Sequence, residues 1–95
     1  VPRFMPVERD LAVVVGEEVP AGDVLAAVRG TAQNLASVTL FDVYRKPPVP
    51  GGHKSLAMRL VYQPRERTLT EDDLSSDRQS IVARLEKEFG AKQRL

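Results

Sequence analysis

Three residues near the middle of the chain carry side chains that suit a planar, hydrogen-bonding ligand. Tyr44 offers an aromatic ring on which a nucleobase can stack, a contact that contributes ~1–3 kcal/mol. Asp42 offers two acceptor oxygens, which match the N1–H and N2–H donors of guanine. Ser55 adds a hydroxyl, although a serine on a strand is most often an ordinary polar residue. These residue types indicate recognition by stacking and hydrogen bonding.

The elements that must position these side chains follow a regular order. Apolar runs and alternation favour strands over residues 11–15, 37–45 and 54–62. Apolar residues at helical spacing favour one helix over residues 20–35 and a second helix after Thr70. The order is therefore strand, helix, strand, strand, helix.

Local signals mark the ends of these elements. Residues 46–52 hold three prolines and two glycines, which favour a loop between paired strands. Thr70 and Asp73 have the spacing of a capping box, and Gly90 suits the left-handed position after a helix. Residues 91–95 can add an edge strand. We therefore predict an α+β fold, a ferredoxin-like split βαβ sandwich whose antiparallel sheet has two helices on one face and the other face open.

Alternation also predicts which side chains lie on each face of the sheet. Those expected toward the helices are Leu11, Val13, Val15, Phe41, Val43, Leu56, Met58, Leu60 and Tyr62. Those expected on the open face are Asp10, Ala12, Val14, Leu40, Asp42, Tyr44, Ser55, Ala57 and Arg59. The two alanines leave room for a flat ligand, and a basic rim is expected from Arg45, Lys46 and Lys54.

Charge is balanced overall but uneven along the chain. The net charge is +1, yet residues 42–67 hold six basic side chains against two acidic ones. A basic surface beside an exposed ring suits a single-stranded nucleic acid. Simpler interpretations stay open: small surfaces often scatter charge unevenly, Tyr44 can merely cover the outer sheet face, and Asp42 can pair with Arg45 or Arg59.

Composition excludes several classes of function. With 95 residues, no cysteine and one histidine, the chain is one domain, residues 1–95, without thiolate or two-histidine metal sites. No apolar run is long enough to span a membrane. Ser55 has no catalytic partners suggested by sequence, His53 is an ordinary loop-edge histidine, and glycine-rich phosphate or acylphosphatase-like cradles are missing. The first residue is not Met, so we expect a piece excised from a longer chain.

Four motifs carry a family resemblance. They are Arg9-Asp10-Leu11-Ala12, Leu40-Phe41-Asp42-Val43-Tyr44-Arg45, Lys54-Ser55-Leu56-Ala57-Met58-Arg59-Leu60 and Arg67-Thr68-Leu69-Thr70. In this order and spacing, they resemble the ferredoxin-fold anticodon-binding domain that ends the β subunit of bacterial phenylalanine–tRNA ligase. The similarity covers nearly the whole chain.

The resemblance implies a non-catalytic module that binds the anticodon stem-loop of tRNA(Phe). It implies that Tyr44 stacks on the first anticodon base, that Asp42 bonds to this guanine, and that Ser55 and Arg94 take part. Arg59 and Arg45 are expected to supply positive charge toward the RNA, while Arg9 belongs to a motif that can be purely structural. Catalysis, ATP and magnesium are implied for other domains of a cytoplasmic α2β2 enzyme. A single-chain organellar synthetase is the runner-up, and a small-ligand or protein-interaction module is the alternative from another class.

Overall fold

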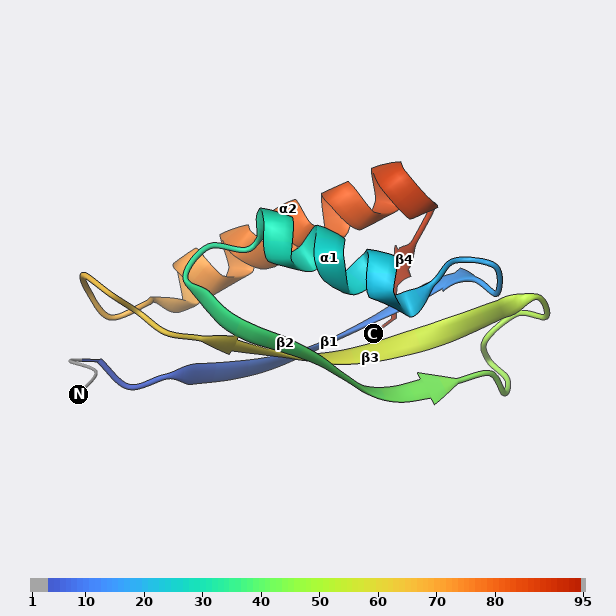
Figure 1. Ribbon diagram of the computed structural model, residues 1–95, viewed down its shortest axis with the longest axis horizontal. Helices are drawn as coiled ribbons and strands as arrows, with labels where there is room; N and C mark the ends of the chain where they lie inside the picture. The colour runs from blue at the N-terminus through green and yellow to red at the C-terminus, as the bar shows by residue number, and fades with distance from the viewer. Residues whose placement is uncertain (1–3, 95) are drawn as a thin grey trace.

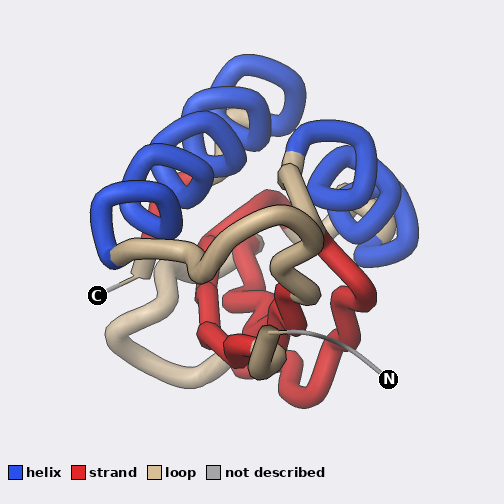
Figure 2. The backbone as a smooth tube through the Cα atoms, turned by 90° about the vertical axis from the view of Figure 1, so that its left-hand side faces the viewer, coloured by secondary structure: helices blue, strands red, loops and turns tan. Residues whose placement is uncertain are grey.

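The computed structural model of the protein describes residues 4–94 and shows one antiparallel sheet with both helices on the same face (Figure 1). The elements in chain order are β1 Val7–Gly16, α1 Ala21–Thr31, β2 Leu35–Tyr44, β3 His53–Tyr62, α2 Glu71–Phe89 and β4 Lys92–Gln93. The strands lie side by side in the order β2-β3-β1-β4. Figure 2 shows the two helices next to each other on one side of the strands. The predicted ferredoxin-like α+β fold is confirmed.

The core fills the space between the sheet and the helices. The central strands β1 and β3 present alternate apolar residues to it, and the helices add one buried stripe each. Its fully buried members include Val13, Val15, Val24, Val28, Leu56, Met58, Ile81 and Leu85. Because β1 and β3 alternate as predicted, their other side chains point away from the helices and form the open face.

The start of α2 is fixed by a reciprocal cap, as the sequence predicted. The Thr70 hydroxyl accepts a hydrogen bond from the Asp73 N–H at 3.1 Å, and the Thr70 N–H donates to Asp73 Oδ2 at 2.8 Å. Arg67 adds two hydrogen bonds to the same carboxylate, at 2.6 and 3.0 Å. The Arg67 hydrogen bond, more than the Thr70 N–H, holds the pKa of Asp73 well below its usual range. Gly90 ends the helix at φ 67°, in the left-handed region.

This cap gives a test of the fold. Thr70→Ala is expected to lower the free energy of unfolding by ~1 kcal/mol, because the Asp73 N–H loses its acceptor. Urea unfolding followed by circular dichroism measures the change. Thr70→Ser keeps the hydroxyl and should stay close to the wild type; an equal loss in both variants would contradict the capping role.

The first helix is shorter than predicted. It ends at Thr31 rather than near residue 35, because Ala32 is extended and Asn34 has a left-handed φ of 61°. The Gln33 N–H, no longer helical, donates to Asp77 Oδ1 at 3.0 Å. Leu35 therefore belongs to β2, where it still packs against the core. Leu35 lies at helical spacing from the apolar residues of α1 in the sequence only by coincidence.

A β-bulge in β2 overturns part of the face prediction. Leu40 pairs with Met58 and Asp42 pairs with Ala57, so Phe41 is an extra residue with no partner of its own. Leu40 therefore shares the helix-facing side with Met58, whereas the sequence predicted it on the open face. Phe41 was predicted to face the core but is 49% exposed. Beyond the bulge, Asp42 and Tyr44 keep their predicted side.

Candidate nucleic-acid interface

The open face is built from cross-strand rows on β2, β3 and β1. Tyr44 pairs with Ser55, and Ser55 pairs with Val14. In the next row Asp42 pairs with Ala57, and Ala57 pairs with Ala12. Because paired residues share a face, these side chains form one surface with the two alanines at its centre. Both helices described within residues 4–94 lie on the other side of the sheet (Figure 1).

Tyr44 presents its ring on this open face. The guanidinium carbon of Arg94 lies 4.7 Å from the centre of the ring, and the phenol donates a hydrogen bond to the Pro47 carbonyl at 3.2 Å. The other tyrosine, Tyr62, is buried on the helix side and donates to Asp77 Oδ2 at 2.6 Å. Burial, followed by this hydrogen bond, raises the pKa of Tyr62. Of the two phenols, Tyr44 is the one available to a ligand.

Ser55 lies in the middle of the face but is only 1% exposed. Arg94 follows β4, at one side of the sheet, and its N–H donates to the Ala12 carbonyl on β1. The side chains of Arg94 and Tyr44 meet on the open face, where Ser55 lies between Val14 and Tyr44 in its cross-strand row. The Ser55 hydroxyl is therefore not accessible to a ligand in the free chain.

Asp42 is exposed, and its side chain has no hydrogen-bond or ion-pair partner among residues 4–94. The two arginines that were candidates to pair with it are engaged elsewhere. Arg59 donates to Asp10 Oδ1 at 3.1 Å, and Arg45 donates to both carboxylate oxygens of Glu17. The Asp42 carboxylate is thus free to accept hydrogen bonds from a ligand.

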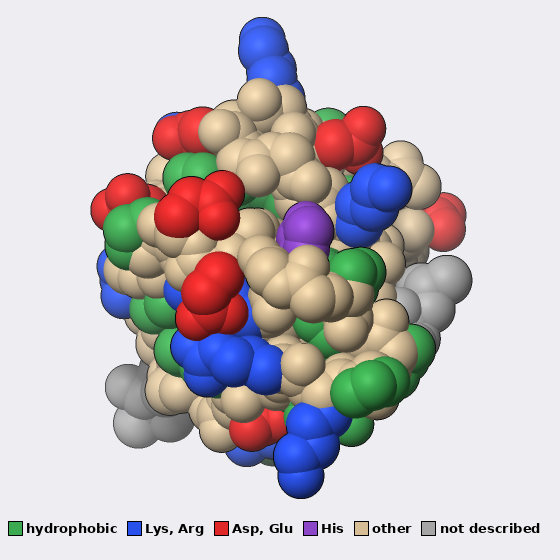
Figure 3. All heavy atoms as spheres, turned by 90° about the vertical axis from the view of Figure 1, so that its right-hand side faces the viewer, with side chains coloured by type: hydrophobic (Ala, Val, Ile, Leu, Met, Phe, Trp, Pro, Cys, Tyr) green, Lys and Arg blue, Asp and Glu red, His purple; other side chains and the backbone are tan. Residues whose placement is uncertain are grey.

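The basic rim differs from the prediction. Lys54 is only 9% exposed and pairs with Val15 on the helix-facing side of the sheet. Alternate residues of a strand share a face, so Lys54 lies on the same side as the core residues of β3. Arg45 is held by Glu17, and this hydrogen bond lowers the pKa of the glutamate. Figure 3 looks onto the loop end of the sheet, where acidic and basic side chains intermingle around the histidine. The basic side chains on the open face are Arg59, which is paired with Asp10, Arg94, which lies over Tyr44, and Lys92, which pairs with Val14 at the edge strand.

Alternation alone missed Phe41 as a face residue. The guanidinium carbon of Arg59 lies 4.8 Å from the centre of the Phe41 ring, which brings the ring to the same face as Tyr44. The only signal in the sequence was an apolar aromatic residue directly beside the polar Asp42, and this does not reveal a bulge.

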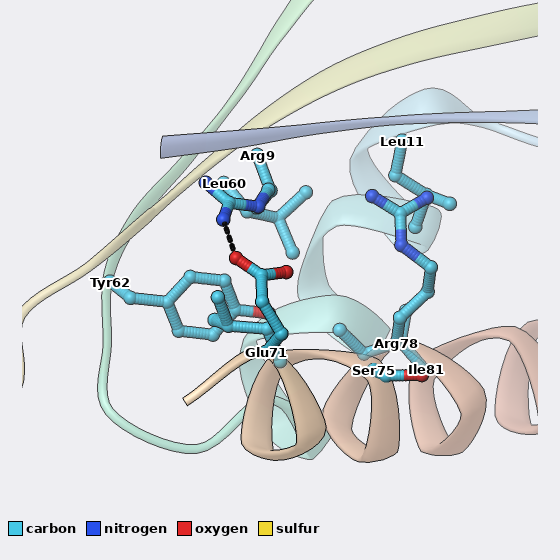
Figure 4. A pocket seen from close by; sticks show the side chains of 9 residues that line it. Arg9, Leu11, Leu60, Tyr62, Glu71, Ser75, Arg78 and Ile81 are labelled. Atoms are coloured by element: carbon cyan, nitrogen blue, oxygen red, sulfur yellow. Dashed lines mark hydrogen bonds and ion pairs between the residues drawn. The ribbon is translucent and has the colours of Figure 1, made fainter. Parts of the chain in front are cut away.

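A pocket of about 240 Å³ lies on the opposite side of the sheet, against α2 (Figure 4). Arg9 at its mouth donates to Glu71 Oε1 at 2.6 Å, and Arg78 donates to the Asp10 carbonyl at 2.7 Å. Both arginines are thus engaged by groups of this chain, and they tie β1 to α2. Arg9 has a structural contact and lies away from the open face.

The described part of the chain, residues 4–94, has no cluster of three or more His, Asp or Glu side chains arranged to hold a metal ion. Within the same residues, neither helix is long and apolar enough to cross a membrane.

The fold and the open face define a small ferredoxin-like binding module with an aromatic and arginine-bearing surface. The profile of the ferredoxin-fold anticodon binding domain matches residues 2–94. The chain belongs to this family, which is a family of binding domains, as the four sequence motifs predicted.

Curated relatives agree with this assignment. The chain is 49% identical over 90 residues to the phenylalanine–tRNA ligase beta subunit of Dickeya dadantii, covering 94% of this chain. It is 47% identical over 91 residues to that of Moorella thermoacetica, covering 95%, and 44% identical over 92 residues to that of Geobacillus kaustophilus, covering 96%. The chain spans 11% of the length of each of these relatives.

Proposed function

We propose that this chain docks the anticodon loop of tRNA(Phe) on its open sheet face. The observation that carries the proposal is the Tyr44 ring, which lies on an uncovered antiparallel sheet beside the free carboxylate of Asp42. A ring on a sheet is the stacking platform that single-stranded RNA loops use, because their splayed bases expose both a flat face and a hydrogen-bonding edge.

Each site residue then has a distinct role. Tyr44 stacks on the first anticodon base, and Asp42 accepts the two donors on the edge of guanine. Arg59 and Arg94 place positive charge on the same face, near the phosphates. Ser55 contacts the anticodon beside Tyr44, its cross-strand neighbour, once side chains around it rearrange. Arg45 contributes charge from the loop end, where Glu17 holds it in the free chain.

We further propose that the domain works as part of a larger enzyme. The relatives are phenylalanine–tRNA ligase beta subunits, which supports this proposal. The proposed partners are the rest of a β subunit and an α subunit, in a cytoplasmic α2β2 assembly. Aminoacylation, with ATP and magnesium, takes place in other domains. Correct docking of the anticodon contributes binding energy that is used at the distant acceptor end.

Titration of the 95-residue chain with anticodon stem-loops that differ at one base tests the proposal. We expect affinity for the tRNA(Phe) stem-loop that falls as salt is raised, because arginines replace counterions at the phosphates. A chain that binds no stem-loop and instead forms a concentration-dependent oligomer, indifferent to salt, would favour the protein-interaction alternative.

Base preference tests Asp42 separately. Asp42→Asn is expected to reduce the preference for guanine at the first anticodon position by about tenfold, because an amide replaces one acceptor oxygen with a donor. The ratio of Kd values for stem-loops with guanine and adenine at this position measures it. Glu66→Gln, which removes an exposed carboxylate in the loop after β3, is the matched control. An unchanged ratio in Asp42→Asn would remove Asp42 from the recognition site.

A further inference from the structure

We infer that Phe41 and Arg59 form a second base-binding position on the open face, for a nucleotide next to the one held at Tyr44. This inference rests on the proposed function and extends it to Phe41, to which the family resemblance assigns no role. Phe41 is the extra residue of the β2 bulge, and the residue is 49% exposed. It is absent from the core, including the partly buried residues around it.

The position has the chemistry that single-stranded RNA requires. The ring of Phe41 offers a flat apolar face, and the guanidinium of Arg59 lies 4.8 Å from its centre. Asp10 Oδ1 accepts a hydrogen bond from Arg59 Nε at 3.1 Å, which fixes the direction of the arginine. Aromatic rings and arginine planes both stack on bases, so the Phe41 ring and the Arg59 guanidinium together offer a stacking surface.

The same arrangement occurs twice on the face. Tyr44 with Arg94, at 4.7 Å, repeats the ring-and-guanidinium pair of Phe41 with Arg59. The two rings come from one strand, three residues apart, so their Cα atoms are separated by about 10 Å or less at ~3.3 Å per residue. A common RNA-binding module with a four-stranded sheet uses aromatic residues on that sheet to stack two or three bases. The bulge is what makes the second ring available, because regular alternation would turn Phe41 toward the helices.

Phe41→Ala in the 95-residue chain is the direct test, with labelled stem-loops and fluorescence anisotropy as the readout. We expect about tenfold weaker binding of the tRNA(Phe) stem-loop, because a base loses its stacking partner. Phe41→Trp should retain the affinity, and since the chain has no other tryptophan, RNA should quench its fluorescence. Val43→Ala, on the helix-facing side of the same strand, is the matched control and should bind as the wild type does.

Abasic RNAs show which contact is lost. Two stem-loops are used, one without the base before the first anticodon position and one without the base after it. With one of these RNAs, we expect Phe41→Ala and the wild type to bind equally, whereas Tyr44→Ala should still weaken binding.

The outcomes separate the two ideas. If the wild type binds no stem-loop, the proposed function fails and the second position fails with it. If Tyr44→Ala weakens binding but Phe41→Ala does not, only the second position is overturned. It is also overturned if Phe41→Ala weakens binding equally for the intact and both abasic RNAs, because the ring would then contact something other than a neighbouring base. Circular dichroism of each variant excludes unfolding as the cause.

Discussion

Replacing Tyr44 by alanine is expected to weaken binding of the tRNA(Phe) stem-loop by tenfold or more, because stacking on one aromatic ring contributes ~1–3 kcal/mol. The variant should fold normally, since the ring lies outside the core. Anisotropy titration measures the change. In a ligase that carries this domain, the same substitution should raise the KM for tRNA and leave formation of phenylalanyl-adenylate unaffected.

Tyr44→Phe separates the ring from its hydroxyl. It keeps the stacking face and loses only the hydrogen bond to the Pro47 carbonyl, so its affinity should stay near that of the wild type. If phenylalanine were as damaging as alanine, the loop position set by Pro47 would matter more than stacking. Loss of adenylate formation in Tyr44→Ala would contradict a role limited to docking.

Replacing Leu56 by alanine is expected to produce the largest loss of stability, ~2–5 kcal/mol. Leu56 is 1% exposed on the central strand β3, and alanine leaves a cavity between the sheet and the helices. The free energy of unfolding of a domain of this size is small, so a loss of this magnitude should lower the urea midpoint sharply. The measurement is urea unfolding at neutral pH.

Val43 provides the control for this substitution. It pairs with Leu56 on the neighbouring strand, but it is 36% exposed. Val43→Ala should therefore cost less than ~1 kcal/mol. Comparable losses at the two positions would mean that the core extends to the β2 edge of the sheet, contrary to the burial described above.

Local signals predicted most of the fold. The valines of β1, the alternation of β3 and the Thr70 cap each act within a few residues, so they can be read directly from the sequence. The bulge at Phe41 could not be predicted in this way, because it depends on how β2 pairs with β3 across the sheet. The prediction that Asp42 and Tyr44 lie on the open face was reached through a regular strand that β2 does not form.

Electrostatic pairing was the other part that the sequence did not reveal. Arg45 and Glu17 are far apart in the chain and meet only because the end of β2 lies near the turn after β1. The same holds for Arg59 and Asp10, which are neighbours only through strand register. Counting charges along residues 42–67 therefore overstated the positive charge available to a partner.

The position of Arg94 over Tyr44 has a consequence for selectivity. In the free chain the guanidinium of Arg94 already lies over the ring of Tyr44. In the proposed function, a base that stacks on this ring therefore displaces the guanidinium. An exposed cation–π contact contributes ~0.5–1 kcal/mol, and the binding free energy of the base must exceed this value. A base that stacks poorly and forms no hydrogen bond on its edge does not bind strongly enough to displace the arginine. If the ring holds a base as proposed, Arg94 therefore favours nucleotides whose stacking and edge contacts together are stronger than its own contact with the ring.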